Sequence, residues 1–331
     1  MCAHVYYCHA TLAEIPKRGF SPRALMALSD GNPLPHQVCY TRAELLSAAS
    51  DVSLPHGRLL IPGQQEKVGL NCVHGFLKPA ALTKSRYLLK LAPHEGEGAF
   101  LEEMPANEHL TMQIAAQAFK VIVAPNACLE LLDEERAYCV RRFDRQEGRP
   151  VHVEDFCQLS GRSPMTHGLN YRTNCSYEEM AGWLRNCCAH YRMEVARLFR
   201  RIVVNYCLSN GQAHLKDFSV IRTVSGDFVL APAYDLQNTA LHFSNTPLMA
   251  MPLFKDEAAV PPKGYTLSDF KRFGRVIGVE DYRIEEVFAM LKISHEKVSH
   301  LIDHSFLSTK AKKVYRHVVL QRCRKLLGKT L

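Results

Sequence analysis

The chain has 331 residues, of which 47% are hydrophobic and 22% are charged, and its formal net charge at pH 7 is +8. These fractions are ordinary for a globular protein, and the length allows one large core or two linked lobes. No run of about 18 apolar residues occurs, so no membrane-spanning helix is expected. The N-terminus also lacks the basic start and apolar core of a secretory signal.

The twelve cysteines are scattered and mostly lie within apolar helical patterns. We therefore expect reduced, buried thiols in a cytoplasmic protein. One N-terminal cluster, made of Cys2, His4, Cys8 and His9, contains residue types that bind metals. No second ligand pair follows at the spacing of a zinc finger, which favours an ordinary first strand over a metal site.

The first part of the chain predicts mixed α and β structure. A strand, a glycine turn and a second strand are expected over 59–70, because apolar residues flank Gly63. A helix is expected from Pro105 through Phe119, with apolar residues near helical spacing. The other strands predicted in this part are 76–79, 87–91, 121–123, 128–132 and 137–143.

After residue 144 the composition shifts towards glycine, serine and asparagine, with one short helix expected over 153–159. A long amphipathic helix is predicted over 193–208, with Arg197, Arg200 and Arg201 on its polar face. A hairpin follows, and then polar helices over 266–327. We predict an α+β fold of two lobes, a small α/β lobe over 1–144 and a mainly helical lobe over 145–331, with a nucleotide bound between them.

The C-terminal segment 308–331 carries eight Lys or Arg and no acid. Such a basic helical end could contact nucleic acid or an acidic partner. A solvated helix face is favoured instead. In that interpretation four apolar residues of the segment turn inward, namely Val314, Val318, Leu320 and Leu327.

Two groups of residues carry possible chemistry. Lys90 lies on a predicted strand ahead of a helix that carries Glu108, and a lysine held by a glutamate in this way can orient the phosphates of ATP. His214, Lys216, Asp217 and Asp235 flank the hairpin, where two carboxylates can bind Mg²⁺. From the residues alone, the second group is equally explained by a surface Lys216–Asp217 pair and a capping Asp235.

Seven motifs, in order along the chain, resemble those of the HipA family of bacterial toxin kinases, and in particular its short HipT form. The catalytic motif D-x-H-x-K-N-F-S aligns with Gln212–Ser219, and the metal motif P-x-Y-D aligns with Pro232–Asp235. The remaining five motifs are the phosphate loop at 62–67, the lysine strand at 88–91, the helix start at 107–108, the hinge at 140–145 and the segment 154–158.

The resemblance implies a two-lobed fold like that of protein kinases and a Ser/Thr kinase that uses ATP and Mg²⁺. It places Asp217 and Asp235 at the metal, and Gln212, Lys216 and Asp217 at the catalytic positions. The ATP-binding positions that it implies are Gly63, Gln65, Lys67, Lys90, Glu108, Arg141, Phe143, His214 and Tyr234.

The resemblance also implies partners. These are a helix-turn-helix antitoxin similar to HipB, a small protein similar to HipS, and a protein substrate such as an aminoacyl-tRNA synthetase. DNA would be contacted only through the antitoxin complex.

Two residues depart from the family pattern. Gln212 stands where the family has its catalytic Asp, and a glutamine amide cannot accept a proton near neutral pH. Asp217 stands where the family has Asn, which adds a negative charge to the metal site. Three hypotheses fit Gln212: a natural pseudokinase or regulatory scaffold that binds nucleotide, an active kinase that uses Asp217 as a relocated base, or a deliberately inactivated variant.

Overall fold

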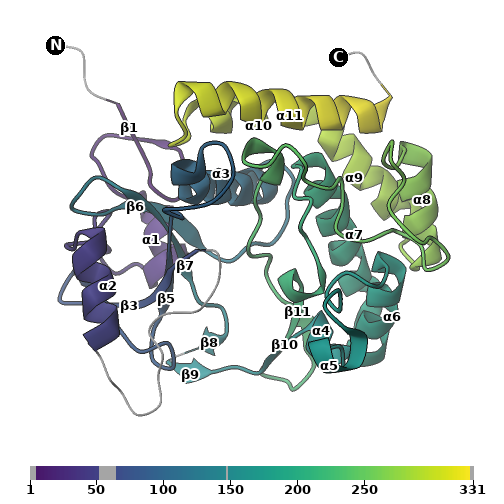
Figure 1. The fold of residues 1–331 in the computed structure, drawn as a ribbon, viewed down its shortest axis with the longest axis horizontal. Coiled ribbons are helices and arrows are strands. Elements are labelled where there is room, and N and C mark those ends of the chain that lie inside the picture. Colours follow the sequence, from purple (N-terminus) through teal and green to yellow (C-terminus); the bar gives the residue numbers. More distant parts are fainter. Residues whose placement is uncertain (1–4, 52–64, 147, 329–331) are drawn as a thin grey trace. The chain divides into compact units, whose positions relative to one another are not determined.

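The computed structural model describes residues 5–51, 65–146 and 148–328 (Figure 1). These residues form two compact units that alternate along the chain. The first contains the described residues up to Gln113 together with 124–149 and 300–312, and the second contains 114–123, 150–299 and the residues from Lys313 onward. The lobe boundaries inferred from the sequence stay a prediction, but the mixed α+β class is confirmed.

The helices and strands follow one another through both units. The helices are α1 (Pro22–Ser29), α2 (Arg42–Asp51), α3 (Met104–Gln117), α4 (Phe156–Leu159), α5 (Pro164–His167), α6 (Tyr177–Cys187), α7 (Tyr191–Cys207), α8 (Leu267–Val276), α9 (Asp281–Ile293), α10 (His295–Asp303) and α11 (Thr309–Leu327). The strands are β1 (Tyr6–Tyr7), β2 (Glu14–Ile15), β3 (Lys67–Val73), β4 (Phe76–Pro79), β5 (Tyr87–Leu91), β6 (Asn126–Glu130), β7 (Arg136–Arg141), β8 (Arg145–Gln146), β9 (Arg149–Pro150), β10 (Val153–Asp155), β11 (Ser219–Arg222) and β12 (Phe228–Leu230).

An antiparallel sheet in the order β4-β3-β5-β7-β6 forms the centre of the first unit (Figure 1). Successive side chains of a strand point to opposite faces. Tyr87, Leu89 and Leu91 of β5 are buried in one cluster with residues of α1 and α2. Lys90 therefore faces the other side of the sheet, where it meets Glu108 of α3. The sheet lies between α1 and α2 on one face and α3 on the other.

Helix α7 is the centre of the second unit, and its apolar face is buried as the helical periodicity predicts. Phe199 packs edge-on against Phe288 of α9, with ring centroids 6.2 Å apart, and tilted against Phe273 of α8. Gly274 permits close packing of α8, since a Cβ there would lie 2.6 Å from Ile284 Cδ1. A three-stranded antiparallel sheet, β10-β11-β12, completes this unit.

Two local predictions are wrong because long-range partners decide the structure. The helix expected over 153–159 begins only at Phe156, because Val153–Asp155 pair with Ser219–Ile221 as β10. No strand forms over 121–123, where only Val123 makes an isolated bridge to Ala233.

The inward face expected for the C-terminal helix is partly wrong. Leu327 of α11 is buried as expected, but the side chain of Val314 is 38% exposed. Tyr315, Val319 and Leu326 are buried in addition. Arg322 Nε donates to Ser209 Oγ at 3.2 Å, so one cation of the basic segment is used within the second unit.

The described part of the N-terminal Cys/His cluster lies inside the first unit. Cys8 is buried and donates to Ser21 Oγ, and the buried His9 ring lies 2.7 Å from the Cys128 carbonyl. Cys2 and His4 lie outside the described residues, and the described part of the chain contains no group of three metal-ligating side chains. The described cysteines are all free thiols.

None of the described helices is long and apolar enough to span a membrane.

Two buried histidines make the stability of the fold sensitive to acid. Burial lowers the pKa of His9 from 6.5 to about 4 and that of His109 to about 3. The unfolded chain thus binds more protons than the folded chain below pH 6.5, so the free energy of unfolding falls as the pH drops towards 4. We expect a slope of up to about 1.4 kcal/mol per pH unit for each histidine.

Urea unfolding at several pH values between 5 and 7 measures this slope. In His9→Gln the slope should decrease, whatever the absolute stability of the variant. His317→Gln is the matched control, because His317 is exposed. Equal slopes for the parent chain and His9→Gln would refute the assignment.

Candidate functional site

The first group of candidate residues is centred on a buried ion pair in the first unit. Lys90 Nζ lies 2.6 Å from Glu108 Oε1, and the two residues are only 3% and 1% exposed. Lys90 Nζ also lies 5.3 Å from the centroid of the Tyr138 ring, which is in cation–π range. Strand β5 and helix α3 thus bring together the lysine and the glutamate that the sequence paired.

Lys67 lies directly opposite Lys90 across β3 and β5, so the two lysines share one face of the sheet. Like charges in this arrangement repel each other, and Glu108 compensates one of them. An anion such as a phosphate would compensate the other. Gln65, just before β3, places its amide 3.7 Å from the sulfur of Met104. Gly63 lies outside the described residues.

The structure directs Arg141 away from this group. Arg141 is paired with Tyr87, and Lys90 with Tyr138, so Arg141 and Lys90 lie on opposite faces of the sheet. Arg141 Nη1 donates to the Ala27 carbonyl at 2.9 Å and lies 2.7 Å from Asp30 Oδ1. Its predicted contact with ATP stays a prediction that the geometry does not favour. Phe143 follows the end of β7 and is half-buried.

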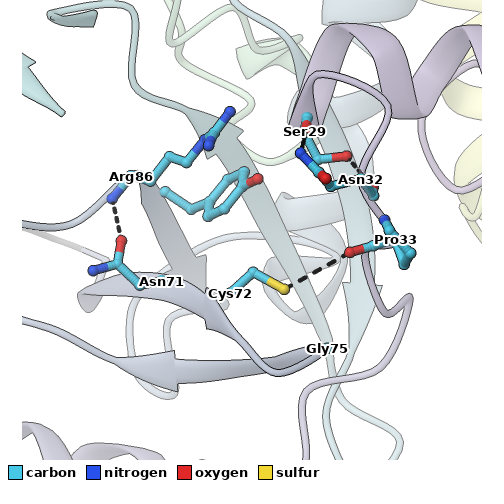
Figure 2. A pocket seen from close by; sticks show the side chains of 8 residues that line it. Ser29, Asn32, Pro33, Asn71, Cys72, Gly75 and Arg86 are labelled. Atoms are coloured by element: carbon cyan, nitrogen blue, oxygen red, sulfur yellow. Dashed lines mark hydrogen bonds between the residues drawn. The ribbon is translucent and has the colours of Figure 1, made fainter. Parts of the chain in front are cut away.

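The α1 side of the sheet contains its own hollow, of about 390 Å³ (Figure 2). The Arg86 backbone N–H donates to Asn71 Oδ1 at 2.7 Å, and the Cys72 thiol is directed towards the Pro33 carbonyl. The Arg86 side chain binds Asp30, the same carboxylate that Arg141 uses. This hollow thus belongs to the arginine side of the sheet and not to the Lys90 side.

The second group of candidate residues lies in the second unit, in the loop between α7 and β11. His214 Nδ1 lies 2.8 Å from Asp217 Oδ2, which is an ion-pair distance, but the contact lacks hydrogen-bond geometry. The same carboxylate accepts the His214 backbone N–H at 3.0 Å. Burial raises the pKa of Asp217, and the nearby Asp235 carboxylate acts in the same direction.

Asp235 adopts a left-handed backbone conformation, with φ of +55°. This conformation is uncommon for residues other than glycine, and it persists where the surrounding structure enforces it. Tyr234 contributes to that support, because its hydroxyl bonds to Ser219 Oγ and donates to the Lys216 carbonyl at 3.0 Å. Burial raises the pKa of Tyr234, so it remains a neutral phenol.

Two carboxylates that influence each other's charge form a donor set suited to Mg²⁺. This ion prefers oxygen ligands and is usually held by one or two carboxylates, with phosphate oxygens and waters as its other ligands. Asp217 and Asp235 fit that arrangement. The sequence explained these residues equally well by a Lys216–Asp217 surface pair. That pair does not form, since Lys216 Nζ is 3.8 Å from Asp155 instead.

Gln212 has an exposed side chain between the buried Gly211 and Ala213. A Cβ at Gly211 would lie 1.9 Å from the Pro247 carbonyl oxygen, so only glycine fits at this position. The Gly211 N–H donates to Thr239 Oγ1 at 3.2 Å. The loop therefore presents Gln212 to solvent from a tightly held backbone.

Sequence reasoning placed Arg201 on the polar face of α7, and this was wrong. Arg201 is 2% exposed, and its Nη2 donates to the Ala231 carbonyl at 2.5 Å. Its guanidinium carbon lies 5.5 Å from the centroid of the Phe218 ring. Arg201 thus contacts segments next to both Asp217 and Asp235. The two adjacent arginines in the sequence carried no signal as to which would be buried.

Comparison with known proteins identifies the family. A family model described as the HipA-like C-terminal domain matches residues 59–301. A protein of Haemophilus influenzae named "Putative kinase" is 26% identical over 327 residues, with 91% of this chain and 92% of the relative covered. A Sinorhizobium fredii protein, "Putative kinase Y4dM", is 30% identical over 209 residues, and the match covers 56% of this chain and 47% of that relative.

Solved structures share the fold. HipA of Shewanella oneidensis, in its toxin–antitoxin complex with HipB and operator DNA, superposes with a TM-score of 0.65 at 19% identity, covering 92% of this chain and 78% of that one. The proinflammatory kinase CtkA of Helicobacter pylori gives a TM-score of 0.55 at 12% identity, with 83% and 93% covered. The family model spans most of the sequence, and the chain therefore belongs to the family of proteins with a HipA-like C-terminal domain.

Proposed function

We propose that the chain binds Mg-ATP and is a Ser/Thr protein kinase whose phosphotransfer is limited by Gln212. The buried Lys90–Glu108 pair carries this proposal. A buried ion pair contributes little net stability, because the cost of desolvation offsets the attraction. A role in function explains the pair better than a role in stability does. Kinases use such a pair to orient the α- and β-phosphates of ATP.

Each unit contributes its own group of proposed residues. In the first unit Lys67, Lys90 and Glu108 form the proposed phosphate group, and in the second unit Asp217 and Asp235 form the proposed metal group. Bound Mg²⁺ would neutralise phosphate charge. Asp217 and Asp235 would hold the ion, while Lys67 and Lys90 would bind phosphate oxygens. The His214 backbone N–H orients the Asp217 carboxylate, and Tyr234 supports the backbone before Asp235. We leave Arg141 out of this set because its guanidinium binds Asp30 on the opposite face of the sheet.

Thermal unfolding with and without nucleotide tests the proposal. ATP with Mg²⁺ should raise the melting temperature, because a ligand that binds only the folded state stabilises it. In Asp235→Asn the affinity for Mg-ATP should fall by about tenfold or more, equivalent to about 1.4 kcal/mol. The matched control is Asp256→Asn, at an exposed carboxylate.

Two outcomes would contradict the proposal, and each contradicts a different part of it. No shift at millimolar Mg-ATP would contradict nucleotide binding altogether. An unchanged Mg²⁺ dependence in Asp235→Asn would remove Asp235 from the metal site and leave nucleotide binding intact.

A second candidate function is a scaffold that binds nucleotide without transferring phosphate. Gln212 favours it, because an exposed amide offers no base for the substrate hydroxyl. Nucleotide binding is common to both candidates. Only a measurement of phosphotransfer separates them.

The proposed biological role is that of a toxin in a toxin–antitoxin pair, of the short HipT type. It is supported by the shared fold with Shewanella HipA, whose structure is a complex with HipB and operator DNA. The corresponding partner of this chain would be a helix-turn-helix antitoxin, through which DNA is reached. A HipS-like protein and an aminoacyl-tRNA synthetase as substrate rest on the motif resemblance.

A further inference from the structure

A small basic hollow of about 60 Å³ lies in the second unit. Its lining includes neither Asp217 nor Asp235. It is lined by Lys120, Val121, Ile122, Arg197, Arg200 and Arg201. Four of these six residues are cations, and three of the four come from positions 197, 200 and 201 of α7. A space of this size is far below that of a nucleotide pocket.

The lining contains N–H donors that lack acceptors. Nε and Nη1 of Arg201, and Nε of Arg200, are buried and have no hydrogen-bond partner in the part of the chain that the structure describes. Arg201 uses only Nη2, which donates to the Ala231 carbonyl. Buried donors are nearly always paired with protein, water or a bound group, so this cluster calls for an acceptor.

The charge of the lining is only partly compensated. Arg197 binds Glu194, with the shorter contact at 2.7 Å, and Arg200 lies 3.0 Å from Glu286. Within the described ranges, neither Arg201 nor Lys120 makes an ion pair with a carboxylate. Burial lowers the pKa of Arg201 to about 9, and the charge of Arg197 acts in the same direction, whereas Tyr234 and the Glu194 carboxylate act against this shift.

We propose that this hollow binds one small inorganic anion, of the class of chloride or phosphate, with Arg201 as its principal ligand. Such an anion would accept the unpaired N–H groups and balance the excess positive charge, which a neutral water would not do. Arg197 and Lys120 would contribute charge from the rim.

The same site is linked to the segment that carries Asp235. The Ile122 carbonyl, from the lining, accepts the Ala233 N–H at 2.8 Å. Arg201, also from the lining, binds the Ala231 carbonyl. Both contacts fall within four residues of Asp235. Anion binding should therefore slow the opening of this segment, whether or not nucleotide is present.

The test uses the full chain without nucleotide, at constant ionic strength, while gluconate is replaced by chloride in one arm and by phosphate in another. We expect a saturable shift of the Arg201 Nε–H signal in NMR and slower hydrogen exchange at the Ala233 amide. Arg201→Lys keeps the charge but loses the fork of donors, and it should weaken anion binding by about 10- to 100-fold.

Lys120→Gln should weaken binding while leaving the core of α7 intact, because Lys120 is exposed and, within the described residues, its Nζ donates only to the Gln117 carbonyl; this keeps the test valid if Arg201→Lys is poorly folded. Arg192→Gln is the control, on the same helix and exposed. An absence of any anion dependence would show that the hollow holds water only and would overturn the proposal. Equal anion dependence in the parent, Arg201→Lys and Lys120→Gln would overturn it too. Whichever of chloride and phosphate saturates at lower concentration identifies the preferred anion.

Discussion

Replacing Gln212 by Asp is expected to raise phosphotransfer by about 100-fold or more, because a positioned general base contributes about 10²- to 10⁴-fold. The exposed Gln212 side chain already lies on a backbone that Gly211 holds tightly. A carboxylate at this position could accept the hydroxyl proton of a substrate. The nucleotide residues Lys90 and Asp235 are unchanged in this variant, so affinity for Mg-ATP should stay the same.

Transfer of label from ATP to proteins of a cell extract measures the effect. Gln212→Asn is the matched control, since it changes the side chain length as Asp does and supplies no base. Mass spectrometry of the labelled acceptor tests the proposed synthetase substrate. Strong and equal activity in the parent and Gln212→Asp would show that Gln212 does not limit transfer and would direct attention to Asp217. No activity in either form would favour the scaffold.

The second large effect concerns the Lys90–Glu108 pair. Lys90→Met should lower the free energy of unfolding by about 3–5 kcal/mol, because it removes the cation that pairs with the buried Glu108 carboxylate. The double variant Lys90→Met with Glu108→Leu should recover most of that loss, since replacing a whole buried pair by apolar residues is often neutral or stabilising. Stabilisation by Mg-ATP should be lost in both.

Denaturant unfolding with and without Mg-ATP provides both measurements. The partly exposed pair Lys271–Glu285 supplies the control, and Lys271→Met there should cost no more than about 1 kcal/mol. A stable double variant that still responds to Mg-ATP would show that the pair serves the fold alone. A double variant as unstable as the single one would show that the pair is needed for packing.

Local patterns predicted several elements closely. The strands Phe76–Pro79 and Tyr87–Leu91 were predicted with the bounds that they have in the structure, and the helix expected over 193–208 is α7, shifted by two residues at its start. In these segments alternation or helical spacing coincides with burial, so local and tertiary preferences agree. The pairing of Lys90 with Glu108 was also predicted, because kinases steady a strand lysine with a helix glutamate to orient ATP.

Other features depended on partners that are distant in the chain. Residues 153–155 became strand β10 because residues 219–221 supply its hydrogen bonds. Arg141 is directed to Asp30 because of its register against Tyr87. A pattern within one segment contains no information about such a partner, and the free energy of pairing overrides the local preference.

The sequence by itself determined which residue types are available for chemistry: a strand lysine, a helix glutamate, two acids around a hairpin, and a glutamine where a base would act. Only the tertiary structure decided how they are used. It buried Lys90 with Glu108 and brought the charges of Asp217 and Asp235 close enough to interact. It also buried Arg201 beside the segment leading to Asp235, while the adjacent Arg200 kept a partner at the surface. The reason is that burial and charge compensation depend on neighbours in space, which the order of residues does not specify.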